Sequence, residues 1–150
     1  MIFLHFIDQN TEEHKKEAFL SQCRSRFPLI SVSLFENLNH DLLLDDIIIV
    51  ASPGLTRDSY FFLAILQVKL FFSDEDDGQA WLDSKSTELP KETVEIEGCA
   101  LFDQIYCETK NPPVFSLDGS NRQLQVRDVD KLLSMAGQPH LEELIDSKKV

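Results

Sequence analysis

The chain has 150 residues, of which 43% are hydrophobic and 27% are charged, as is typical of one folded globular domain rather than a disordered chain. Its net charge of −12 disfavours nucleic acid and anionic membranes as ligands, because both are bound mainly through Lys and Arg. A partner protein with a basic surface is the class of ligand that this charge favours.

Three segments in the first third of the chain predict strands. Ile2–Ile7 is a short apolar run with aromatic and β-branched residues, which indicates a buried strand. Ile30–Leu34 alternates apolar and polar residues, as does a strand with one wet face at a sheet edge. Ile47–Ala51 is apolar without alternation, which predicts a strand covered on both faces in a parallel sheet. Between the first two, Thr11–Phe27 has apolar residues at a spacing of four, which favours a helix ending at Pro28.

The next stretch is apolar but has no clear period. Ser52 to Thr56 contains Pro and Gly and reads as a turn, and we predict a helix over residues 56–66 and a strand over 68–72. Tyr60–Phe72 is then either core or, where it is exposed, a surface for oligomerisation.

An acidic segment follows and interrupts the regular elements. Residues 73–108 hold eleven Asp or Glu and two Lys, a local charge of −9, whereas residues 109–150 are neutral. We predict an acidic loop or insertion at about 73–92, with one short helical turn around Trp81. Beyond it, Glu92–Glu97 predicts a strand, Cys99–Cys107 fits either strand or helix, and Val114–Leu117 predicts a short strand.

The last part is predicted to be helical at about 126–146. Apolar residues from Val126 to Ala136 recur at spacings of three and four, Gly137 is a candidate helix terminator, and Pro139 precedes a second short helix. Strands that alternate with helices indicate a single α/β domain over 1–150. We expect a Rossmann-like or flavodoxin-like layered fold with a mainly parallel central sheet flanked by helices.

In a parallel sheet, ligands bind beyond the carboxyl ends of the strands. Small polar loops at those ends predict a possible ligand crevice, although the same residue types also build ordinary turns. Its members are Asp8, Asn10, Ser52, Gly54, Asp118 and Ser120.

The acidic segment is the other candidate site. Four consecutive acids and a nearby tryptophan form a candidate docking surface for a basic partner, with the aromatic ring as an apolar anchor. These residues are Asp74, Glu75, Asp76, Asp77 and Trp81. Ser73, which precedes the acids, also resembles the target of an acid-directed kinase.

Catalytic, metal and cofactor motifs are lacking. There is no GxGxxG and no GxxxxGK[ST], and the four histidines have neither HExxH nor zinc spacing, so we expect no metal and no cofactor. The cysteine count is odd and no CxxC occurs, which favours free thiols in a reducing compartment, and we expect a cytoplasmic protein. The three are Cys23, Cys99 and Cys107.

Two functional hypotheses follow. The first is a non-catalytic acidic interaction module: an adaptor, an assembly subunit or an inhibitor of a basic protein. The second is a small Rossmann-like enzyme or nucleotide sensor that uses the strand-end crevice.

Overall fold

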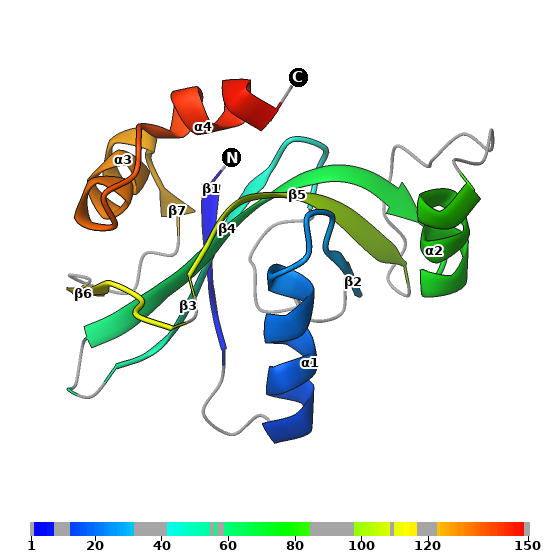
Figure 1. Ribbon diagram of the computed structural model, residues 1–150, viewed down its shortest axis with the longest axis horizontal. Helices are drawn as coiled ribbons and strands as arrows, with labels where there is room; N and C mark the ends of the chain where they lie inside the picture. The colour runs from blue at the N-terminus through cyan, green and yellow to red at the C-terminus, as the bar shows by residue number, and fades with distance from the viewer. Residues whose placement is uncertain are drawn as a thin grey trace.

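The computed structural model describes residues 2–7, 13–31, 42–54, 56, 59–84, 98–108, 110–116 and 123–148. This part of the chain forms a seven-stranded sheet in the order β2-β5-β4-β3-β1-β7, with β6 also paired to β4 (Figure 1). The strands are β1 Ile2–Phe6, β2 Leu29–Ser31, β3 Ile47–Pro53, β4 Ser59–Phe72, β5 Cys99–Cys107, β6 Val114–Ser116 and β7 Gln123–Leu124. The helices are α1 Glu13–Cys23, α2 Glu75–Ser84, α3 Val126–Met135 and α4 Leu141–Lys148.

The sheet is mixed and mostly antiparallel, so the prediction of a mainly parallel, Rossmann-like or flavodoxin-like sheet was wrong. Among the described strands only β1 and β3 pair in parallel, and the other pairs are antiparallel. The reason lies between Pro53, the last residue of β3, and Ser59, the first of β4. So short a connection reverses the chain into a hairpin, whereas a parallel pair needs a long crossover.

The long strand β4 lies where a helix was predicted at 56–66, so that prediction was wrong, and β4 includes the strand predicted at 68–72. It pairs with β3 along one side and with β5 and β6 along the other. Side chains on both of its faces are buried, as Phe62 and Leu66 are, each with no exposed surface. A strand covered on both faces has no polar alternation, and its apolar run therefore resembles that of a buried helix.

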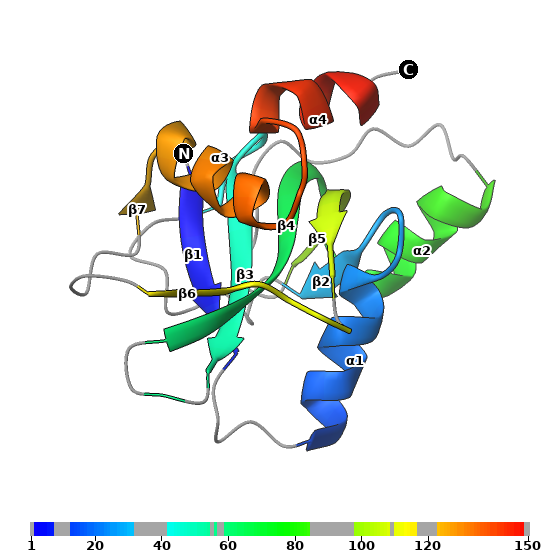
Figure 2. The same ribbon diagram turned by 60° about the vertical axis from the view of Figure 1, so that its left-hand side comes forward.

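Helices lie on both faces of the sheet (Figures 1 and 2), and an apolar cluster fills the space on each face. Helix α1 lies on one face, where Phe19 and Cys23 join a core cluster with residues of β1, β3, β4 and β5. Helices α3 and α4 lie over the other face and bury Val129, Leu133 and Leu141 against it. A third, smaller cluster joins α2 to the end of the sheet formed by β2, β4 and β5.

Several predictions at the level of single elements are confirmed. Ile2–Ile7 contains β1, and Cys99–Cys107, which was open between helix and strand, is β5. Ile47–Ala51 lies within β3, which continues through Ser52 and Pro53, two residues predicted to belong to a turn. The part of Ile30–Leu34 that the structure describes belongs to the edge strand β2. Helices α3 and α4 lie in the region predicted to be helical, and Gly137 follows α3 with a φ of 71°, a left-handed conformation that glycine adopts readily.

Other predictions fall on residues outside the described ranges. These are the strand at Glu92–Glu97 and the end of the acidic segment at 85–92. In the ranges that are described, no helix combines the length and the apolar character that a bilayer crossing requires.

Candidate functional site

The acidic segment folds into a helix directly after the longest strand. Residues 75–84, which were expected to be loop with one helical turn, form the ten-residue helix α2. Asp74 caps its first turn, because Asp74 Oδ1 accepts a hydrogen bond from Asp77 N at 2.8 Å. Ser73, which joins Phe72 to the cap, is half-buried. The helix therefore starts at a fixed position at the end of β4.

The inner side of α2 holds the helix against the sheet. Gly78 is buried, and a Cβ atom placed on it would lie 2.7 Å from Leu29 Cδ1, so glycine permits this close approach. The Trp81 ring packs on the Phe72 ring with their centroids 6.1 Å apart, and Leu82 joins the same cluster. Trp81 is half-buried and anchors α2 to its own sheet, whereas the sequence suggested it as an anchor for a partner.

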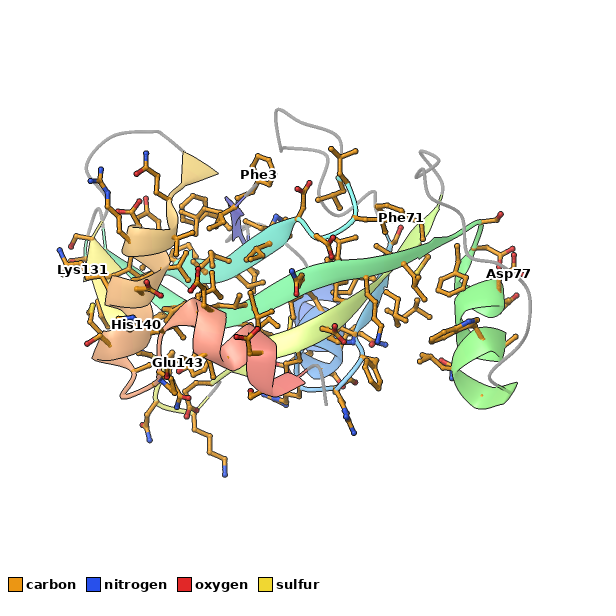
Figure 3. All side chains as sticks on the ribbon, turned by 90° about the horizontal axis from the view of Figure 1, so that it is seen from above. Phe3, Phe71, Asp77, Lys131, His140 and Glu143 are labelled. Atoms are coloured by element: carbon orange, nitrogen blue, oxygen red, sulfur yellow. The ribbon has the colours of Figure 1, made fainter. Side chains whose placement is uncertain are left out.

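The outer side of α2 carries exposed acids. Asp76 and Asp83 are seven residues apart, so they lie on one stripe of the helix, opposite Gly78 and Trp81. Asp77 is also exposed, about 100° around the helix from Asp76 and toward the Trp81 side. Figure 3 places Asp77 at the end of the molecule formed by α2, far from Lys131 and His140 at the other end. We call Asp76, Asp77 and Asp83 the acidic face of α2.

Helix stability accounts for some of these acids but not for all of them. Asp74 is the cap, and Asp76 and Asp77 in the first turn interact favourably with the positive end of the helix dipole. Asp83 lies in the last turn, where a negative charge opposes the dipole, and α2 has no basic residue there. The Gln79 side chain orients Asp83 by donating a hydrogen bond from Nε2 to Oδ1 at 2.9 Å. This i,i+4 pair offsets part of the unfavourable interaction of Asp83 with the dipole, and it holds the carboxylate on the exposed side of the helix.

The structure describes two of the six residues of the predicted crevice. Ser52 is a buried residue of β3, with 8% of its surface exposed, and Gly54 follows the end of that strand. Gly54 N donates a hydrogen bond to Ser59 O at 2.8 Å, so this segment closes the β3–β4 hairpin and does not start a helix. Asp8, Asn10, Asp118 and Ser120 lie outside the described residues.

Two of the three thiols are poor nucleophiles. Cys23, Cys99 and Cys107 form no disulfide. Burial, and next the nearby Cys107, raises the pKa of the Cys23 thiol to about 12. Burial also raises the pKa of Cys107, although the charge of Arg24 opposes the shift. Both thiols are therefore protonated at neutral pH, and a nucleophilic cysteine needs the opposite shift.

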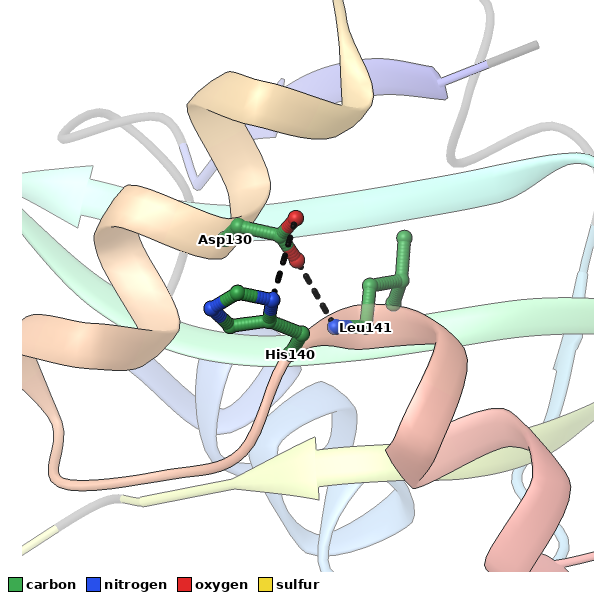
Figure 4. Close-up of polar contacts among 3 residues, drawn as sticks. All are labelled: Asp130, His140 and Leu141. Carbon is green, nitrogen blue, oxygen red and sulfur yellow. Dashed lines mark hydrogen bonds and ion pairs between the residues drawn. The ribbon is translucent and has the colours of Figure 1, made fainter.

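Two histidines, His5 and His140, make contacts that serve packing and helix ends. The His5 ring packs on Phe19 with centroids 5.7 Å apart. His140 lies between α3 and α4, with Nδ1 4.0 Å from Asp130 Oδ2, while Asp130 Oδ1 accepts a hydrogen bond from Leu141 N at 2.8 Å (Figure 4). Asp130 thereby caps α4. Within the described ranges, no three His, Cys, Asp or Glu side chains gather as a metal site would require.

The sequence analysis missed two residues of α2, one on each side of the helix. Asp83 has the seven-residue spacing from Asp76 that marks one stripe of a helix, but this signal needs α2 to be recognised as a helix first. Gly78 read as a loop glycine, and only the contact with Leu29 shows its role.

No family model matches this chain, and no curated protein or solved structure matches it either. The function is therefore inferred from the geometry and charge of the chain itself.

Proposed function

We propose that this protein is a non-catalytic interaction module whose acidic face of α2 docks on a basic surface of a partner protein. The observation that carries the proposal is the stripe of Asp76 and Asp83, two exposed acids on the side of α2 opposite Gly78 and Trp81, with Asp83 oriented by Gln79. The helix beneath is fixed to the sheet through Gly78 and Trp81, so the charges are presented in a defined geometry.

Electrostatics sets what such a surface does. Complementary charge raises the association rate and selects partners, and it contributes less to the final affinity. The effect extends over a Debye length of about 8–10 Å at physiological salt, so only charges near the acidic face act on a docking partner. An adaptor, an assembly subunit and an inhibitor of a basic protein all need such a surface, and we place this activity in the cytoplasm.

The protein's overall charge narrows the partner class. At −12 it repels nucleic acid and anionic lipid, which leaves basic proteins. The strand β4, which contains the region considered for oligomerisation, lies between other strands, and its residues 60–72 are buried or half-buried apart from the exposed Lys69. Oligomerisation through that region is therefore not part of the proposal.

A pair of charge reversals tests the proposal. Asp76→Lys with Asp83→Lys reverses the acidic face, and Glu142→Lys with Glu143→Lys reverses two exposed acids of α4 as a matched control. Both double variants change the net charge equally. A basic protein is first captured from the native source on the immobilised chain. The rate at which it associates with each variant is then measured at several ionic strengths.

We expect the α2 variant to associate roughly tenfold more slowly at low salt and to lose most of its salt dependence. The α4 variant should stay close to the unmodified protein. Equal effects of the two variants would show that only net charge matters and would refute a defined docking face.

A further inference from the structure

Two of the three cysteines lie on the same face of the sheet, where α1 meets β5. Cys23 is the last residue of α1, has 1% of its surface exposed and belongs to the core cluster beneath that helix. Cys107 is the last residue of β5, is half-buried and packs against the same cluster. Both thiols therefore contribute to one apolar region although they are far apart in sequence.

Hydrogen bonds hold the two segments together at this point. Gln104 Nε2 donates to the carbonyl oxygen of Cys23, and Gln104 N donates to Arg26 O at 3.2 Å. The two residues after Gln104, Ile105 and Tyr106, contribute to the core of the opposite face. Along β5, Cys107 is therefore the first residue after Gln104 that packs on the face of the sheet covered by α1.

The ionisation of the thiols agrees with this placement. Cys107 is the second cause, after burial, of the raised pKa of Cys23, so each sulfur lies within range of the other's charge. Cys99 differs: it begins β5 at the other end, is buried with 3% exposed, and belongs to the cluster under α2. The topology thus pairs Cys23 with Cys107 and leaves Cys99 apart.

We propose that Cys23 and Cys107 form a reversible disulfide that ties the end of α1 to the end of β5. The oxidant is a small-molecule disulfide such as oxidised glutathione. Cys107, the more exposed thiol, loses its proton and attacks one glutathione sulfur, which expels one glutathione as thiol. Cys23 then loses its proton and attacks the Cys107 sulfur, which expels the second glutathione. The protein loses two electrons, oxidised glutathione gains them, and both protons end on glutathione.

Because both thiols hold their protons at neutral pH, the reaction is slow there and accelerates with rising pH. In a reducing compartment such a disulfide is expected to be transient. The bond forms only if the two Cα atoms come within about 7 Å, so its formation in the folded chain tests the placement directly.

The experiment uses the full chain, folded, with oxidised glutathione at about pH 8.5, followed by alkylation of free thiols, trypsin and non-reducing mass spectrometry. Cys99 and Cys107 share one tryptic peptide, between Lys91 and Lys110. The Cys99→Ser variant therefore serves to identify the linked sulfur. We expect a peptide linked to Cys23 in the unmodified chain and in Cys99→Ser, and its loss in Cys107→Ser.

The linked form should also melt roughly 5–15 °C higher, and a reducing agent should reverse the shift. If Cys107→Ser is unfolded by circular dichroism, Cys23→Ala replaces it. The proposal is overturned if Cys107 only carries glutathione without a link, if the thiols stay free, or if Cys23 links to Cys99 equally often. Chains oxidised in urea provide the reference for such unselective pairing.

Discussion

Gly78→Leu has opposite effects on the helix propensity of α2 and on the packing of α2 against the sheet. In an isolated helix this change is favourable by about 0.8 kcal/mol, because leucine has the higher helix propensity. In this protein even a Cβ atom at Gly78 would lie 2.7 Å from Leu29 Cδ1 and 3.2 Å from Phe72 Cδ2. The larger side chain must therefore displace Leu29 or lift the helix.

Such overpacking costs typically about 1–3 kcal/mol, which exceeds the propensity gain. We expect Gly78→Leu to lower the free energy of unfolding by about 1–2 kcal/mol. Ala80→Leu adds a similar side chain on the exposed side of α2 and should change stability by less than about 0.5 kcal/mol.

Urea unfolding followed by far-UV circular dichroism measures the two stabilities. Trp81 is the chain's single tryptophan, so its fluorescence reports on α2 alone, and we expect the emission of Gly78→Leu to shift to the red as the ring leaves Phe72. A Gly78→Leu protein as stable as the unmodified chain, with unchanged emission, would refute the close packing of α2.

Two further predictions concern the termini of α1 and α4. Asp130→Ala removes the acceptor for Leu141 N and should lower the free energy of unfolding in urea by about 1 kcal/mol. Asp130→Asn keeps an acceptor and should cost under half as much, because the ion pair that it loses, with the exposed His140, adds little. Equal losses in the two variants would contradict the capping role of Asp130. Burial raises the pKa of Cys23 from its ordinary value of 9.0 to about 12, so the unfolded chain loses this proton first and stability falls with rising pH above 9. By about pH 10.5 the loss in the free energy of unfolding should reach about 2 kcal/mol. The Cys23→Ala variant, which is less stable at neutral pH, should lose correspondingly less stability as the pH rises. Identical pH profiles of the two proteins would exclude Cys23 as the source of the pH dependence.

The sequence predicts elements best where one secondary structure suits a segment and no other does. Ile47–Ala51 is β-branched and continuous, and it is the buried strand β3. Tyr60–Phe72 is also largely buried, but it is rich in Phe and Leu, and leucine suits a helix as well, so the helix predicted over its first part was wrong. Had the strand been recognised from Ser59 onward, the short connection from Pro53 would have predicted the antiparallel direction.

The candidate site could be predicted in composition but not in geometry. The local excess of acids is visible in the residues, and their exposure follows from their charge. The helix α2 has few apolar residues, and those it has, such as Trp81 and Leu82, are grouped so closely that no period emerges. Its helical form depends on packing against Leu29 and Phe72, which lie in other parts of the chain.

The pairing of the outer strands has a kinetic consequence. At one edge of the sheet Leu29 pairs with Leu101, and toward the other Ile2 pairs with Leu124. Each pairing closes a loop of many residues. The conformational entropy lost in closing that loop must be overcome before the contacts between the paired strands can form. Folding should therefore take milliseconds to seconds, as in proteins dominated by non-local strand pairs, with the β3–β4 hairpin as the earliest local contact and both margins of the sheet completed last.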